Sequence, residues 1–181
     1  VGEFPDLQGQ VGRYYALGEG LPDVVADGIR DHYLPRNVND EYPTSDEAAA
    51  VGIADRIDTL VGIFGVGKAP TGSADPYALR RACLTSIAII ANRGFRLDIS
   101  QVLASSIELY ADVLPAEQLE GLQQAALDFY LSRLKRLFAD QTRAGIPGGF
   151  AKDTIDAVVQ ASTSWYDVTD LVARLQAMDQ F

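Results

Sequence analysis

Between Leu79 and Ile90 the chain carries apolar residues on nearly every side of a helix. Such a helix has no polar face to turn toward water, so it is buried among other elements. Asp75 followed by Pro76 is a start signal, because an N-cap residue and a proline at the first helical position both suit a helix N-terminus. Gly94 provides the stop signal. These residues predict a central buried helix with the rest of the chain packed around it.

The other segments show helical rather than strand periodicity, with apolar residues recurring at spacings of three and four. The sequence T-S-D-E from Thr44 to Glu47 predicts a capping box, in which Thr44 caps the helix and Glu47 reaches back. Apolar residues make up 48% of the 181 residues, enough for a core. We therefore expect an all-α fold, a multi-helix bundle forming a single domain across residues 1–181. Further helices are expected near residues 23–34, 44–64, 98–113, 116–143, 152–162 and 167–178.

Composition indicates where the protein works. The single cysteine, Cys83, excludes an internal disulfide and fits a reducing compartment; its apolar helix predicts a buried, inert thiol. The longest apolar stretch, around T-S-I-A-I-I-A, is far shorter than the roughly 20 residues that span a membrane. We expect a cytoplasmic protein with no membrane contact. The chain lacks an initial Met and opens on a pattern already under way, so we expect an internal fragment of a longer protein.

The stretch from Gly62 to Lys68 fits G-x-x-x-x-G-K, the start of a phosphate-binding loop. That loop needs a Ser or Thr after the lysine to hold magnesium, a strand before it and a helix directly after it. Here Ala69 follows the lysine, and Pro70 then lacks a backbone N–H. The preceding residues form an amphipathic helical pattern rather than a strand. The match therefore predicts the end of a helix and not a nucleotide site.

Charge is distributed unevenly along the chain. The net charge is −10, which argues against a nonspecific nucleic-acid binder. Residues 61–96 nevertheless carry five basic and one acidic residue, a net charge of +4, between flanks of −8 and −6. This basic island indicates either a local contact with an anionic partner or internal pairing with the acidic flanks, and charge alone favours neither.

Arg80 and Arg81 fall in the first turns of the central helix, where the helix dipole disfavours cations. They need a nearby anion, and an RNA phosphate or the carboxylates of Asp55 and Asp58 could supply it. Those two aspartates stand three residues apart on one helix, so they could also hold a metal ion with His32. Pairing with arginines is the alternative for them. Because His32 is the only histidine, a histidine-rich metal centre is excluded.

Several long segments resemble the beta subunit of bacterial glycyl-tRNA synthetase. They are EFPDLQGQVGRYYAL, HYLPR, ADRIDTLVGIFGVGKAPTGSADPYALRRA and DVTDLVARLQAM, and the resemblance runs from Glu3 to about Ala91 with little interruption. The resemblance implies a heterotetramer of two alpha and two beta subunits. It places the class II catalytic core, which activates glycine with ATP and magnesium, on the alpha subunit, and assigns tRNA handling to the beta subunit. It also implies that Lys68 belongs to the family pattern and not to an ATP loop.

Within that family the chain resembles the middle, HD-like helical region of the beta subunit. The resemblance implies three partners: the alpha subunit, tRNA(Gly) and the remaining domains of the beta subunit. The implied role is to help bind and position tRNA and to assemble the tetramer, with no catalytic, cofactor or metal site in the fragment, which alone is expected to be inactive. The candidate tRNA-contact residues are Lys68, Arg80, Arg81, Arg93 and Arg96.

The HD-like resemblance also leaves two alternatives. Metal-dependent phosphohydrolases of the HD superfamily use a His, an adjacent His-Asp pair and a distant Asp. Here His32 is followed by Tyr33, so the pair is missing, although Asp55 or Asp58 could match the distant Asp. The pattern favours a degenerate HD scaffold. A metal-dependent HD-type phosphohydrolase and a purely structural helical module stay as the alternative functions.

Overall fold

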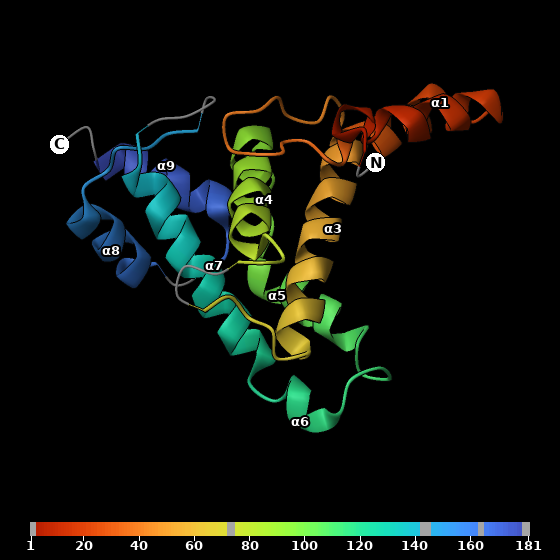
Figure 1. Ribbon diagram of the computed structural model, residues 1–181. Helices are drawn as coiled ribbons and strands as arrows, with labels where there is room; N and C mark the ends of the chain where they lie inside the picture. The colour runs from red at the N-terminus through yellow and green to blue at the C-terminus, as the bar shows by residue number, and fades with distance from the viewer. Residues whose placement is uncertain (1–2, 72–74, 142–145, 163–164, 179–181) are drawn as a thin grey trace.

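The computed structural model describes residues 3–71, 75–141, 146–162 and 165–178. Within those ranges the regular structure is helical, and one isolated bridge joins Asp98 and Asp167. The predicted all-α fold is confirmed. The elements (Figure 1) are a 3₁₀ turn η1 (Pro5–Leu7), α1 (Gln10–Gly18), α2 (Asp23–Asp31), α3 (Asp46–Gly65), α4 (Leu79–Arg93), α5 (Ile99–Glu108), α6 (Ala116–Leu119), α7 (Leu122–Ala139), α8 (Lys152–Ala161) and α9 (Val168–Met178).

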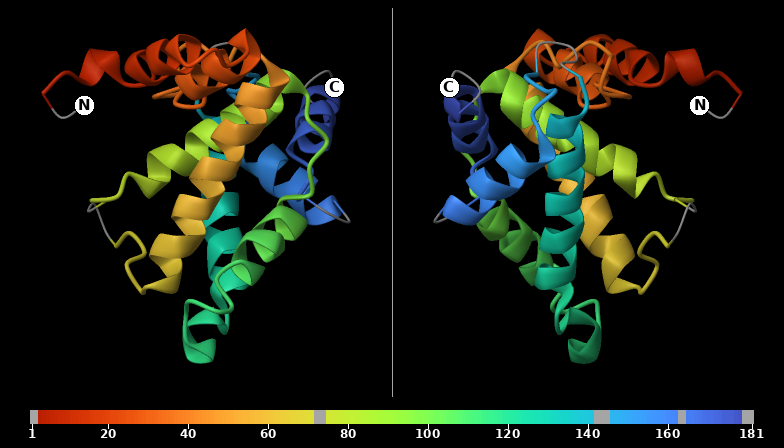
Figure 2. Two further views of the ribbon diagram at one scale, coloured as in Figure 1. Left: turned by 90° about the vertical axis from the view of Figure 1, so that its right-hand side faces the viewer. Right: turned by 90° about the vertical axis from the view of Figure 1, so that its left-hand side faces the viewer.

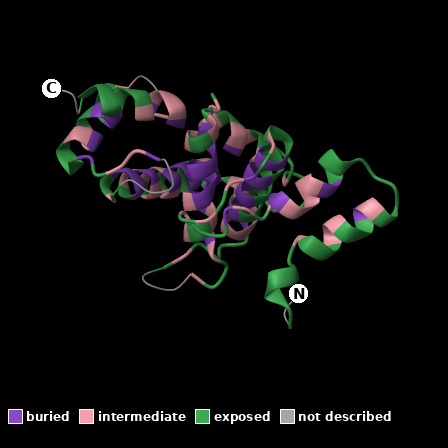
Figure 3. Ribbon diagram, turned by 90° about the horizontal axis from the view of Figure 1, so that it is seen from above, coloured by how far each residue is buried: buried purple, intermediate pink, exposed green. Residues whose placement is uncertain are grey.

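Helix α4 lies in the middle of the bundle and packs against α3, α7 and α9. Its side chains Leu79, Ile87 and Ile90 are fully buried, as its all-round apolar character predicts. The hydroxyl of Tyr130 on α7 lies 3.0 Å from that of Ser86 on α4, so this buried polar pair satisfies itself. Figure 3 shows the buried residues gathered at the centre and mostly exposed residues toward the N-terminus.

Helices α1 and α2 form an arm that packs on the bundle through α3, with α1 projecting away from it (Figures 1 and 2). The arm leaves large apolar side chains in water: Tyr14 is 81% exposed and Tyr15 is 68% exposed. An apolar hollow of about 410 Å³ opens between α2 and α3, lined in part by Val25 and Val51. The arm therefore presents an apolar surface outside the core.

Several helix boundaries differ from the prediction. Ser45, and not Thr44, caps α3: its side chain accepts a hydrogen bond from the Ala48 N–H, while the Thr44 hydroxyl donates to the buried carboxylate of Asp31. The expected helix over residues 116–143 is broken by Gly121, which adopts the left-handed conformation (φ 72°) that suits glycine. Helix α7 ends at Ala139, and residues 142–145 lie outside the described ranges.

The start of α4 is also displaced. The helix begins at Leu79 and not at Pro76, after Ala78 in the left-handed conformation (φ 55°). Asp75 still acts as a cap, because its two carboxylate oxygens accept hydrogen bonds from the Leu79 N–H (2.8 Å) and the Arg80 N–H (2.9 Å). The predicted end is confirmed, with Gly94 in the left-handed conformation (φ 66°).

A buried arginine holds the connection between α2 and α3. Arg56, 9% exposed, donates from Nη2 to three consecutive carbonyl oxygens, those of residues 33–35, at 3.0 to 3.1 Å. Its Nη1 donates to the carbonyl oxygens of His32 (2.9 Å) and Gly52 (2.7 Å), and its Nε donates to the Thr85 hydroxyl (2.9 Å). A Cβ at Gly52 would lie 2.9 Å from the His32 oxygen, so this close approach requires glycine. Arg56 thereby ties three segments together.

Replacing Arg56 with lysine should destabilise the chain strongly. A lysine ammonium is a compact point charge and cannot reproduce the fork of five donors, so several buried carbonyls would lose their partners. Each unsatisfied buried group costs about 1–3 kcal/mol, and we expect Arg56→Lys to lower the free energy of unfolding by at least about 3 kcal/mol in urea denaturation. Arg174→Lys, at an exposed ion pair with Asp170, is the control and should change it by under about 0.5 kcal/mol. Equal effects of the two variants would contradict this role.

A buried carboxylate fixes the same connection from its other side. Asp31 is 1% exposed and accepts hydrogen bonds from the Nε of Arg30 (2.5 Å) and from the hydroxyl and N–H of Thr44 (2.5 and 3.2 Å). Burial alone would raise the pKa of Asp31, but these hydrogen bonds outweigh it, and the pKa lies below its ordinary value of 3.8. The ionised carboxylate is therefore the form that stabilises the fold.

The lowered pKa of Asp31 predicts a pH dependence. Its contribution to stability is fully present above the ordinary value of 3.8 and is lost as the pH falls through the lower folded-state pKa. We expect Asp31→Asn to cost about 1–3 kcal/mol at neutral pH, because Arg30 then loses one of its two charged partners and keeps only Asp27. The free energy of unfolding of this variant should fall less between about pH 5 and pH 3 than that of the wild type. Identical pH slopes in urea titrations would show that Asp31 does not supply this term.

Candidate functional site

The five predicted cationic candidates separate into two groups. Lys68, Arg80 and Arg81 lie on the α3–α4 connection and the first turn of α4. Arg93 and Arg96 lie at the other end of α4, about 20 Å away at 1.5 Å per residue. The structure thus brings three of the candidates together and leaves two apart.

Arg93 and Arg96 make internal contacts. Arg93 donates to the carbonyl oxygen of Pro43, and its Nη1 lies 3.3 Å from the carboxylate of Asp46. Arg96 lies on the surface, where its Nε is 2.5 Å from the carboxylate of Asp167 on the opposite segment. Both arginines therefore connect the C-terminal end of α4 to neighbouring segments.

The cations at the start of α4 have different surroundings. The Nζ of Lys68 lies 5.8 Å from the ring centroid of Tyr77, within the range of a cation–π contact. The side chain of Arg81 is exposed and makes no ion pair or hydrogen bond within the described part of the chain. Asp75 supplies the anion at this helix end, since it binds the first backbone N–H groups of α4. Asp75 thus places a negative charge at the positive end of the α4 dipole. From the sequence, Asp75 was predicted only to begin the helix.

Asp55 and Asp58 do not pair with these arginines in the described ranges. The carboxylate of Asp58 accepts a hydrogen bond from the Tyr110 hydroxyl at 3.0 Å, and Asp55 faces a pocket beside Arg56. Of the two alternatives for Arg80 and Arg81, the described contacts therefore do not support pairing with Asp55 and Asp58.

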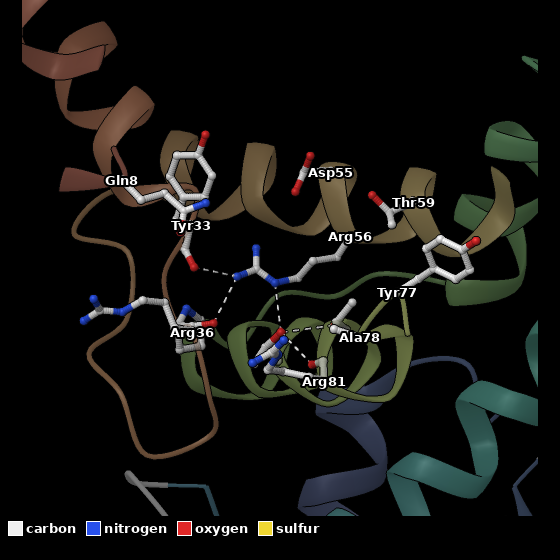
Figure 4. A pocket seen from close by; sticks show the side chains of 12 residues that line it. Gln8, Tyr33, Arg36, Asp55, Arg56, Thr59, Tyr77, Ala78 and Arg81 are labelled. Carbon is white, nitrogen blue, oxygen red and sulfur yellow. Dashed lines mark hydrogen bonds between the residues drawn. The ribbon is translucent and has the colours of Figure 1, made fainter. Parts of the chain in front are cut away.

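A pocket of about 510 Å³ opens where the α2–α3 connection meets α3 and α4 (Figure 4). We call it the arginine pocket, because arginines from three segments line it: Arg36 from the connection, Arg56 from α3 and Arg81 from α4. Asp55 is the carboxylate among its lining residues. The remaining lining residues are Gln8, Tyr33, Pro35, Thr59, Tyr77, Ala78, Ala82 and Thr85.

The three arginines of this pocket differ in how their charge is balanced. Arg36 pairs with Asp40 (2.8 Å), and the hydrogen bond from this guanidinium lowers the pKa of Asp40 to about 2. Among the described residues, Arg56 donates to carbonyl oxygens and one hydroxyl and to no carboxylate. Burial lowers its pKa, because desolvation disfavours the charged form, and this outweighs the nearby charge of Asp55, which acts to raise it. The buried guanidinium of Arg56 therefore places a positive charge at the inner wall of the pocket.

The described residues do not bring the other candidate groups together. Among the described residues, no group of three or more His, Cys, Asp or Glu side chains could hold a metal ion. His32 ends α2 with its Nδ1 3.2 Å from the Gly28 carbonyl oxygen, while Asp58 contacts Tyr110. Cys83 is buried as predicted, and burial raises the pKa of its thiol far above the ordinary value.

The G-x-x-x-x-G-K stretch is the end of α3, as predicted. Helix α3 continues to Gly65, and the N–H of Lys68 donates to the carbonyl oxygen of Ile63 at 3.0 Å. The backbone donor that a phosphate loop would offer is thus used to close the helix. In the described ranges, none of the helices has the length and apolar character needed to cross a membrane.

Comparison with known proteins places the chain in a family. The family model described as glycyl-tRNA synthetase beta subunit matches residues 1–160. The chain is 44% identical to the glycine–tRNA ligase beta subunit of Myxococcus xanthus, over 98% of this chain and 24% of the relative. It is 42% identical to that of Geobacter metallireducens over 100% and 25% of the two chains, and 40% identical to that of Aromatoleum aromaticum over 100% and 24%.

These matches define an aminoacyl-tRNA synthetase family. The chain belongs to the family of glycyl-tRNA synthetase beta subunits. It spans about a quarter of the length of the curated relatives it matches.

Proposed function

We propose that the chain is the part of a glycine–tRNA ligase beta subunit that helps bind and position tRNA(Gly) and assemble the enzyme. The observation that carries this proposal is the match to beta subunits along the whole chain. Glycine and ATP are activated in the alpha subunit, by a class II catalytic core with magnesium. The fragment is a non-catalytic region of a cytoplasmic α₂β₂ heterotetramer.

The tRNA-facing surface lies around Lys68, Arg80 and Arg81. A phosphodiester backbone is drawn to cations that release its counterions, and these residues cluster at one end of α4 in a chain whose net charge is −10. Arg93 and Arg96 are weaker candidates, because RNA would compete with Asp46 and Asp167 for them. Contact with RNA is therefore concentrated at the start of α4.

Assembly uses the apolar arm of α1 and α2. Residues 3–31 carry six acidic and two basic residues, so the arm repels RNA, while exposed side chains such as Tyr14 favour burial against protein. The remaining domains of the beta subunit and the alpha subunit are the partners for this surface. RNA and protein thus approach the chain at different places.

The tRNA role is tested by replacing Arg80 and Arg81 with glutamine in the complete ligase. Each lost phosphate contact should reduce the slope of log affinity against log salt by about one, so we expect weaker tRNA binding and a slope lower by up to about two. The thermal melting temperature should stay unchanged. Arg174→Gln, an exposed arginine on α9, is the matched control and should leave affinity and slope unaltered.

The alternatives give different results in this experiment. Unchanged affinity and an unchanged salt slope would indicate a purely structural helical module. Metal-stimulated phosphate release from nucleotides that Asp58→Ala abolishes would instead indicate a phosphohydrolase.

A further inference from the structure

The arginine pocket contains a buried positive charge that bonds to no carboxylate in the described part of the chain. All five N–H donors of Arg56 point to carbonyl oxygens and the Thr85 hydroxyl, so its position is fixed but its charge is not neutralised by an ion pair. A buried charge is costly unless an opposite charge compensates it. The nearby carboxylate of Asp55 supplies part of that compensation, because its charge acts to raise the Arg56 pKa against the larger effect of burial, and an anion in the pocket would add to it.

Arg81 offers the free donors of this pocket. Its guanidinium reaches the pocket from the first turn of α4, and its side chain has no partner within the described ranges. Figure 4 shows the Arg36 side chain pointing away from Arg56 and Arg81. Arg36 binds Asp40 through its Nε and Nη2. Arg81 is therefore the arginine that can donate to a ligand in the pocket.

The donor set selects the chemistry of the ligand. A planar guanidinium fork matches the oxygens of a phosphate group and binds them more strongly than neutral donors do. The Tyr77 and Thr59 hydroxyls line the same pocket and can donate as well. The backbone N–H groups at the start of α4 are taken by Asp75, so binding depends on side chains and not on the helix end.

Asp55 and Arg81 should affect phosphate affinity in opposite directions, because their charges are opposite. Its carboxylate is the acidic group among the lining residues, and it repels an anion placed beside it. Removal of this charge should strengthen phosphate binding, whereas removal of Arg81 should weaken it. A purely structural pocket would show neither response.

We propose that the arginine pocket binds one phosphate group, with Arg81 as the donor and Arg56 as the fixed positive charge beneath it. The phosphate comes from an RNA backbone or from a free phosphate compound, since both present the same tetrahedral anion. An RNA phosphate as the ligand rests on the proposed tRNA role, whereas phosphate binding by the pocket does not depend on that role.

The pocket is tested with inorganic phosphate as the probe, added to the complete ligase at constant ionic strength and followed by isothermal titration calorimetry. Phosphate bound elsewhere is common to all variants, so differences between variants report on this pocket. We expect Arg81→Gln to weaken this binding about tenfold and Asp55→Asn to strengthen it several-fold. Arg174→Gln is the matched control and should bind as the wild type does. Equal phosphate binding by all four proteins would overturn the proposal.

A competition experiment distinguishes the two sources. If RNA supplies the phosphate, inorganic phosphate at constant ionic strength will weaken tRNA binding more in the wild type than in Arg81→Gln. If phosphate binding depends on Arg81 but leaves tRNA affinity unchanged, the pocket stands and its ligand is a free phosphate compound. The tRNA role could then still hold through Lys68 and Arg80. Loss of tRNA binding on Arg80→Gln alone, with no phosphate response at Arg81, would keep the tRNA role and reject the pocket.

Discussion

The rest of this structure depends on the hydrogen bonds that the buried guanidinium of Arg56 donates. The α2–α3 connection turns four successive carbonyl oxygens, those of residues 32–35, toward α3, where they need donors. Arg56 supplies them from one side chain and also bonds Thr85 on α4. The apolar arm, the central helix and the arginine pocket therefore meet at a single residue. Lysine would keep the charge but lose most of the bonds.

Most of the fold could be predicted because helix formation and burial are read from local patterns. The all-round apolar segment from Leu79 to Ile90 is the central helix, and Gly94 ends it. Two errors were local, at the left-handed residues Ala78 and Gly121, and one arose where a distant residue competed. Thr44 gave its hydroxyl to Asp31, 13 positions away, and left the cap to Ser45. No short-range pattern contains that partner.

The site was harder to predict than the fold. Summing charge along the sequence located Lys68, Arg80 and Arg81, but it grouped them with Arg93 and Arg96 at the other end of α4. The same charge count did not identify Arg36 and Arg56, because residues 1–60 carry a net charge of −8, although both arginines line the pocket. One signal was present: Arg56 falls at helical spacing among Ile53, Ile57 and Leu60, on the face that becomes buried. An arginine on an apolar face must find acceptors, and here they lie on a connection that sequence spacing does not locate.

The most direct test of this account is a structure of the complete ligase with tRNA(Gly) bound. The account predicts RNA against the start of α4, with a backbone phosphate within hydrogen-bond distance of the Arg81 guanidinium, and protein packed on the apolar arm of α1 and α2. RNA bound only at distant surfaces, with the arginine pocket filled by a carboxylate side chain from another domain, would contradict it. In that case the pocket would be a protein–protein contact, and the start of α4 would have no role in binding tRNA.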